Sequence, residues 1–252
     1  MHRHQHHRLL TLLLAAASAI AGAQPAPPEG PSGWAPKQPV SARRAMIATA
    51  NPLATDAGFR ILAQGGSAVD AAVAAQLVLN LVEPQSSGIG GGAFIVHHHG
   101  RTGNIAAYDG RETAPAAATP ERFLGADGKP LTFADAVVGG RSVGVPGTLR
   151  VLELAHRKHG RLPWASLFVP AIELAERGFA VSARLHGALG NEKALLRDAA
   201  ARAYFYQADG KPHPVGYVLR NPEFAATLRQ IAAGGADAFY RGAIARDIVA
   251  KV

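Results

Sequence analysis

The sequence predicts an α+β fold, and three observations support this prediction. Two helix-start signals lie close together, at Asn51-Pro52 and at Ser67. Two short apolar segments follow, 93–98 and 104–109, and most of the remaining chain has helical patterns broken by glycine and proline. The order helix, helix, hairpin and then many helices is typical of an α+β fold or of a layered α/β/β/α arrangement.

The length and composition are compatible with one large folded domain. The chain has 252 residues, of which 48% are hydrophobic and 17% are charged. This share of hydrophobic residues is sufficient for a core, and it excludes a disordered chain. No internal repeat is visible in the sequence.

The first 23 residues have the pattern of a signal peptide. Residues 1–8 are basic, residues 9–20 are almost wholly apolar, and residues 21–23 (Ala-Gly-Ala) form a small-residue cleavage signature. The apolar run is too short to cross a bilayer comfortably, and no later run reaches about 18 apolar residues. We therefore expect an exported protein, periplasmic or secreted, without a membrane span.

A proline-rich leader is expected over 24–42, and the folded domain over 43–252. The first element of the domain is predicted to be a short buried strand, 45–49. Asn51 then serves as an N-cap, with Pro52 at the first position of a helix that ends at Gly65-Gly66.

The second helix, 68–82, is predicted to be buried on all sides because it is apolar around its whole circumference. Ser67 and Asp70 form a capping box at its start, which explains its only charge. A glycine-rich turn, 85–92, comes next. The strands 93–98 and 104–109 then form a hairpin through Gly100 and Gly103.

The second half of the chain is predicted to be mostly helical. The helix 148–159 has a basic last turn and stops at Gly160. The further helices are predicted at 163–168 and 171–177, broken at Pro170, after the cap Ser182, and at 191–201, 222–233 and 243–252. The last of these has no C-cap after it, so we expect the chain to be a fragment of a longer protein.

Several classes of function are excluded or disfavoured. The chain has no cysteine, which excludes disulfides, thiolate metal sites and cysteine nucleophiles. His97 and His99 can share one strand face, but without a nearby carboxylate they make a poor metal site, so no metal is predicted. The glycine-rich turn lacks the Lys-Ser/Thr of a P-loop and is followed by a strand, so no nucleotide cofactor is predicted.

The basic charge is not interpreted as a nucleic-acid site. The formal net charge is +8, but the arginines are scattered and aromatic residues are not interleaved with them. No nucleic-acid partner is therefore expected, and the charge is assigned to solubility. A serine-hydrolase motif of the Gly-x-Ser-x-Gly type is absent as well.

Arg111 is the strongest candidate for a binding residue. It follows the second predicted strand, and its guanidinium group matches a carboxylate in a bidentate way. On the residues alone, an ordinary ion pair with Asp109 or Glu112 is the stronger interpretation.

Five motifs in sequence resemble the N-terminal part of the large subunit of γ-glutamyltransferases, also called γ-glutamyltranspeptidases or glutathione hydrolases. The resemblance runs from about Met46 to the end of the chain. The motifs are Gly-Gly-Ser-Ala-Val-Asp-Ala-Ala-Val at 65–73, Ser-Ser-Gly-Ile-Gly-Gly-Gly-Ala-Phe at 86–94, Asp-Gly-Arg-Glu-Thr-Ala-Pro at 109–115, Gly-Val-Pro-Gly at 144–147 and Leu-Pro-Trp-Ala at 162–165.

The resemblance implies an N-terminal nucleophile hydrolase fold, an αββα sandwich that is incomplete in this chain. Members of the family are exported precursors that cleave themselves into two subunits. The N-terminal Thr of the small subunit attacks the γ-glutamyl amide of glutathione. The resemblance implies that Arg111 binds the α-carboxylate of the substrate, with Asp109 and Glu112 as supporting residues. It implies no cofactor and no metal.

The catalytic Thr is expected beyond residue 252, so this chain should contain no catalytic residue and be inactive alone. Its partner would be the small subunit from the same precursor. In its absence, we expect the helix near 73–82 and the strand 94–96 to be under-covered. Two alternatives are a related acylase of the same fold and a truncated, non-catalytic exported binding or assembly module.

Overall fold

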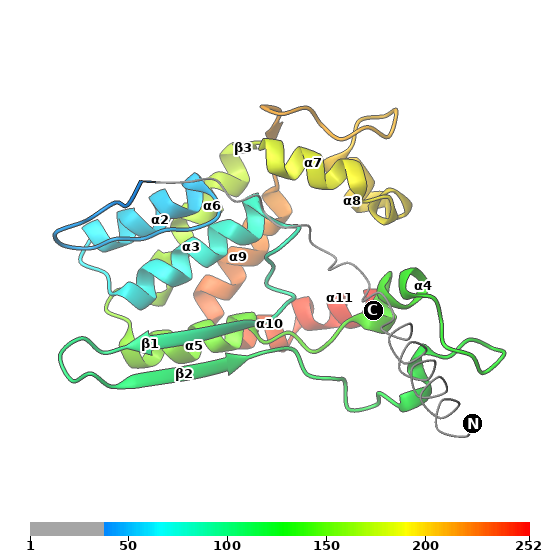
Figure 1. The fold of residues 1–252 in the computed structure, drawn as a ribbon, viewed down its shortest axis with the longest axis horizontal. Coiled ribbons are helices and arrows are strands. Elements are labelled where there is room, and N and C mark those ends of the chain that lie inside the picture. Colours follow the sequence, from blue (N-terminus) through cyan, green and yellow to red (C-terminus); the bar gives the residue numbers. More distant parts are fainter. Residues whose placement is uncertain (1–37) are drawn as a thin grey trace, which may run out of the picture. The chain divides into compact units, whose positions relative to one another are not determined.

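The structure, a computed structural model, describes residues 38–252 and divides the chain into the units 1–43 and 44–252 (Figure 1). The predicted signal peptide and most of the predicted leader lie outside the described residues. Residues 38–43 contain no helix or strand, so the elements below all belong to the second unit. None of the described helices is long and apolar enough to cross a membrane.

The first two helices begin at the predicted caps. In α2 (Pro52–Ala63), the side chain of Asn51 accepts a hydrogen bond from the backbone N–H of Leu53 at 3.1 Å. In α3 (Ala68–Val82), the side chains of Ser67 and Asp70 form the predicted capping box. These starts are confirmed because a cap depends only on residues that are neighbours in the sequence.

Helix α3 lies at the centre of the core. It contacts α2, α5 (Thr148–His159), α6 (Val169–Arg177) and the 3₁₀ helix η3 (Trp164–Phe168). Val73, Leu77 and Val78 are completely buried. The predicted burial on all sides is therefore largely confirmed, whereas the expectation that 73–82 would be under-covered is wrong, because elements of this same chain cover the helix.

The two predicted strands 93–98 and 104–109 form the predicted hairpin. Strand β1 (Ala93–His98) pairs antiparallel with β2 (Ile105–Gly110), and Gly103 has a φ of +74° in the connecting turn, a conformation that favours glycine. One face of the hairpin packs on α5, as Figure 1 shows.

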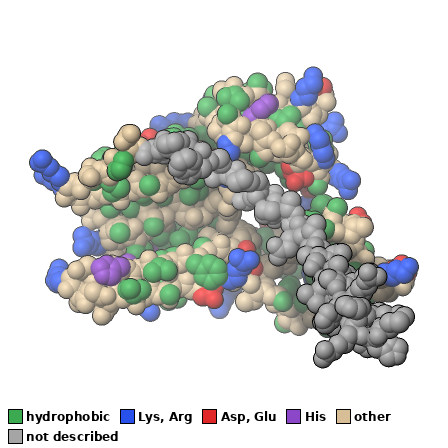
Figure 2. All heavy atoms as spheres, in the orientation of Figure 1, with side chains coloured by type: hydrophobic (Ala, Val, Ile, Leu, Met, Phe, Trp, Pro, Cys, Tyr) green, Lys and Arg blue, Asp and Glu red, His purple; other side chains and the backbone are tan. Residues whose placement is uncertain are grey.

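The other face of the hairpin is apolar and exposed. Phe94, Val96 and Ile105 are 63%, 74% and 71% exposed. Figure 2 shows hydrophobic side chains over this part of the molecule. The expectation of an under-covered strand is therefore confirmed. An exposed apolar patch of this kind is typical of an interface.

The predicted strand 45–49 is wrong. This segment belongs to no helix or strand and pairs with no strand among the described residues, so it has no ladder of hydrogen bonds. Its apolar residue Ile47 instead packs on α2, where a Cβ added to Gly58 would collide with the Ile47 side chain.

The second half of the chain is mostly helical, as predicted, and α6 packs on α9 (Pro222–Gly234). The predicted helix 191–201 is wrong, because Asp198 accepts a hydrogen bond from Ala201 N–H at 2.9 Å and starts a new helix there. The remaining elements are η1 (Pro120–Phe123), α4 (Phe133–Val137), η2 (Gly140–Ser142), β3 (Phe179–Ala180), α7 (Ala183–Asn191), η4 (Ala194–Arg197), α8 (Ala199–Phe205), β4 (Val218–Leu219), α9 (Pro222–Gly234), α10 (Asp237–Tyr240) and α11 (Ala243–Lys251).

Asp70 does more than cap α3. Its side chain is completely buried, and Oδ2 accepts hydrogen bonds from the backbone N–H groups of Ser67, Arg161 and Leu162 at 2.8, 2.9 and 3.2 Å. Its Oδ1 lies 3.5 Å from Nε2 of His156. The carboxylate therefore joins the start of α3 to the segment that follows α5.

His159 joins the end of α5 to the hairpin. Its Nε2 lies 2.6 Å from the Tyr108 hydroxyl, and its ring stacks on His97 with 3.8 Å between centroids. Burial lowers the pKa of His159 below its ordinary value, and the neighbouring His97 and Lys158 lower this pKa further.

Acidification is expected to weaken this contact. As the pH falls through the ordinary histidine pKa of about 6.5, the unfolded chain takes up the proton before folded His159 does, so the folded state loses stability. The urea midpoint should therefore fall more between pH 7.5 and 5.5 in the original chain than in His159→Gln, which keeps a polar group but does not titrate. Equal slopes would contradict this assignment.

Candidate substrate-binding site

Three of the sequence motifs converge at the end of the hairpin. The carbonyl of Gly91, in the glycine-rich turn, accepts hydrogen bonds from the N–H groups of Gly147 and Thr148 at 3.0 and 3.1 Å. Thr113 and Val145 exchange two backbone hydrogen bonds, at 3.3 and 2.8 Å. The turn, the loop after β2 and the connector before α5 therefore form one site, although they are far apart in the sequence.

Glycines permit this close approach. A Cβ on Gly110 would lie 2.5 Å from Cβ of Val151 in α5, and a Cβ on Gly147 would collide with the carbonyl of Gly110. Gly92 leaves room in the same way for the Glu112 carboxylate, whose Oε2 would lie 2.5 Å from an added Cβ. At Gly92, the glycine-rich turn thus serves close packing, as its sequence indicates.

Polar side chains fix the glycine-rich turn to α3. The hydroxyl of Ser87 donates to Oδ1 of Asn80 at 2.7 Å and accepts from Nε2 of Gln76 at 2.7 Å. At the C-terminal end of α3, the buried carboxylate of Glu83 accepts a hydrogen bond from Nδ2 of Asn51 at 2.9 Å. The site therefore rests on the most buried helix of the core.

Arg111 leaves the end of β2 with its neighbours arranged around it. Its side chain is 72% exposed, and its Nε lies 3.4 Å from Oε2 of Glu112. Its backbone N–H donates to Oδ1 of Asp109 at 2.8 Å. Asp109 and Glu112 thus orient Arg111 in different ways, one through the backbone and one through the side chain. Within the described residues, the two terminal guanidinium nitrogens of Arg111 have no partner.

Arg111 lines a cavity of about 740 Å³, a size suited to a small ligand. Glu112, from the same loop, and Gly90, from the glycine-rich turn, also line it. Two further arginines, Arg122 and Arg141, complete a basic wall. The sequence does not predict these two residues as site residues, because they lie in loops without periodicity or a recognisable spacing.

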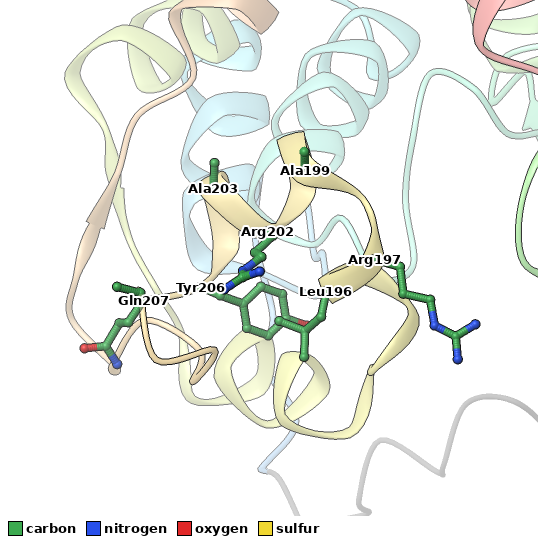
Figure 3. A pocket seen from close by; sticks show the side chains of 8 residues that line it. Leu196, Arg197, Ala199, Arg202, Ala203, Tyr206 and Gln207 are labelled. Atoms are coloured by element: carbon green, nitrogen blue, oxygen red, sulfur yellow. The ribbon is translucent and has the colours of Figure 1, made fainter.

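A second cavity, of about 450 Å³, lies between η4 and α8, away from these motifs (Figure 3). Tyr206 lines it, but its hydroxyl already donates to the carbonyls of Leu189 and Glu192. Arg197 points away from the Tyr206 ring in Figure 3. We assign no chemistry to this cavity.

No set of three or more His, Asp or Glu side chains between residues 38 and 252 is placed to hold a metal ion. His97, which shares a strand face with His99, stacks on His159 instead. The guanidinium groups of Arg111, Arg122 and Arg141, which line the cavity, can bind an anion.

Comparisons of this chain with known proteins point to one family. The family model for gamma-glutamyltranspeptidase matches residues 54–252. The glutathione hydrolase proenzyme of Bacillus subtilis (strain 168) is 41% identical over 241 residues, which cover 95% of this chain and 40% of that protein. The acylase ACY 1 proenzyme of Pseudomonas sp. (strain SE83) is 40% identical over 216 residues, which cover 83% of this chain and 38% of that protein.

Solved structures agree with the sequence comparisons. The crystal structure of Helicobacter pylori gamma-glutamyltranspeptidase superposes with a TM-score of 0.78 at 34% identity, over 84% of this chain and 60% of that one. The chain spans about 40% of the length of the Bacillus subtilis relative. The match to the family model covers most of the chain, and the chain therefore belongs to the γ-glutamyltranspeptidase family.

Proposed function

We propose that this chain is the N-terminal part of the large subunit of an exported γ-glutamyltransferase or glutathione hydrolase, made as a self-cleaving precursor. The observation that carries the proposal is the position of Arg111. Its guanidinium group lines a cavity where three motifs of the family meet, and its terminal nitrogens have no partner in the described part of the chain.

Arg111 has the chemistry needed to hold a γ-glutamyl group. The α-carboxylate of that group accepts two parallel hydrogen bonds from the guanidinium fork, which fixes both position and orientation. Glu112 holds Nε and so directs the terminal nitrogens toward the ligand, and Asp109 fixes the backbone at Arg111. The scissile γ-amide is thereby held at a constant distance from Arg111.

The covalent step belongs to a small subunit outside this chain. The hydroxyl oxygen of its N-terminal Thr attacks the γ-carbonyl carbon, and the Thr α-amino group takes the hydroxyl proton. The amide C–N bond breaks, and the amine leaves with that proton. Water or an acceptor amine then releases the γ-glutamyl group.

The exposed face of the hairpin supports a partner of this kind. Phe94, Val96 and Ile105 are apolar and exposed on one face of the hairpin, and an exposed apolar patch of this kind is typical of a surface that another layer covers. The small subunit would supply that layer and complete an αββα sandwich. The proenzyme names of the relatives support a precursor that is cut into two chains.

Expression of the full-length protein tests the proposal. A denaturing gel should show two chains, and the purified protein should release nitroaniline from γ-glutamyl-4-nitroanilide, whereas residues 24–252 alone should not. A full-length protein that leaves this substrate intact would contradict the proposal.

A related acylase is the second candidate, because the acylase ACY 1 proenzyme is 40% identical to this chain. Arg111 could hold the free carboxylate of a glutaryl amide as well as that of a γ-glutamyl amide. The two acyl groups differ in the α-ammonium group, which only the γ-glutamyl group carries. Faster cleavage of glutaryl-4-nitroanilide than of the γ-glutamyl compound would favour the acylase.

A further inference from the structure

Two arginines with no role in the proposed chemistry share the cavity of Arg111. Arg122 lies in η1 and Arg141 in η2, and both line the cavity. The Nε of Arg122 donates to the carbonyl of Arg141 at 2.6 Å, and its Nη2 lies 3.5 Å from the carbonyl of Gly140. These bonds join the two segments and leave Nη1 of Arg122 without an acceptor among residues 38–252.

The cavity has more positive than negative charge. Among residues 38–252, Glu112 is the only acidic residue that lines it, and its carboxylate pairs with Arg111. Neither Arg122 nor Arg141 forms an ion pair with any described residue. Two guanidinium charges therefore remain uncompensated in one cavity, and such an arrangement attracts anions and binds carboxylates through charge-assisted hydrogen bonds.

We propose that Arg122 and Arg141 form a second anion subsite, which receives a carboxylate on the amine side of the scissile γ-amide. This inference rests on the proposed function, in which Arg111 holds the α-carboxylate. The preferred ligands would be γ-glutamyl amino acids and γ-glutamyl peptides with a free carboxylate. A peptide of three residues spans about 10 Å, and the cavity volume of about 740 Å³ accommodates it.

Two chromogenic donors isolate the contribution of the second carboxylate. γ-Glutamyl-3-carboxy-4-nitroanilide and γ-glutamyl-4-nitroanilide differ by that carboxylate alone. The measured quantity is the ratio of their kcat/KM values in the full-length protein. In the original protein this ratio should favour the carboxylated donor, after correction for the leaving-group pKa with the two free anilines.

Arg141→Gln and Arg122→Gln should each lower this ratio about tenfold, because each removes a charged hydrogen-bond donor. Arg141→Lys should retain part of the preference, since it keeps the charge but loses the fork. Arg101→Gln is the matched control, because it removes the same charge from the exposed hairpin turn and should leave the ratio unchanged. If this ratio of kcat/KM values were the same in the Arg122 and Arg141 variants as in the original protein, the proposal would be overturned.

Direct binding separates failure of the subsite from failure of the proposed activity. Calorimetry would compare S-methylglutathione with its glycine amide, which lacks the second carboxylate. If the original protein binds the acid more tightly than the amide, and Arg141→Gln abolishes this preference, the subsite is supported. This holds even if neither anilide is cleaved, and in that case only the proposed activity is contradicted. Equal affinities for the two ligands in the original protein overturn the subsite even if both anilides are cleaved.

Discussion

Arg111→Lys in the full-length protein is expected to raise KM for γ-glutamyl donors about tenfold, and Arg111→Gln about a hundredfold. Lysine keeps the positive charge but replaces a planar fork by a point charge, so one of two parallel hydrogen bonds to the α-carboxylate is lost. Glutamine loses the charge as well, and a hydrogen bond to a charged group contributes about 1.5–3 kcal/mol. Steady-state kinetics with γ-glutamyl-4-nitroanilide measures both effects.

A second donor shows whether the loss occurs at the α-carboxylate. 4-Aminobutyryl-4-nitroanilide carries the same amide and amine but lacks that carboxylate, so the original protein should strongly prefer the γ-glutamyl compound. Arg111→Gln should reduce this preference, whereas Arg101→Gln should not. If Arg111→Gln weakened both donors equally, Arg111 would act on the fold of the loop and not on the ligand.

The structure explains why the sequence predicts some elements and not others. The caps at Asn51 and Ser67 and the hairpin turn at Gly103 are confirmed, because each depends on residues within a few positions of one another. The segment 45–49 has the composition of a strand, but a strand also needs a partner, and no local pattern reports whether one is present. In the structure, Ile47 packs on α2 instead.

The candidate site likewise contains some residues that the sequence predicts and others that it does not. Arg111, Asp109 and Glu112 are adjacent in the sequence, and the resemblance to a family singles them out. Arg122 and Arg141 reach the same cavity only because the long segment between β2 and α5 folds back on itself. Cavities formed by such loops leave no periodic signal in the sequence, so these two residues could be found only in the folded chain.

Asp70→Asn is expected to lower the free energy of unfolding by about 3 kcal/mol. Asp70 is completely buried, and its Oδ2 accepts three backbone hydrogen bonds, two of them from Arg161 and Leu162. An asparagine oxygen can take the place of Oδ2, but the negative charge is lost. A hydrogen bond to a charged group contributes about 1.5–3 kcal/mol and a neutral one about 0.5–1.5 kcal/mol, so each of the three bonds should weaken by about 1 kcal/mol. Urea denaturation measures the change, and Asp56→Asn on the exposed face of α2 is the control, with an expected change within about 0.5 kcal/mol.

Ser67→Ala distinguishes the local role of Asp70 from its long-range role. Loss of a helix cap costs about 1 kcal/mol, so Ser67→Ala should have roughly this effect, because it removes only the cap of α3. If Asp70→Asn costs no more than Ser67→Ala, the capping box accounts for the whole contribution of Asp70. If it costs about three times as much, most of its stabilising effect comes from the bonds to Arg161 and Leu162, which lie 91 and 92 positions away in the sequence. In that case, the carboxylate that starts the central helix also holds in place the segment that follows α5.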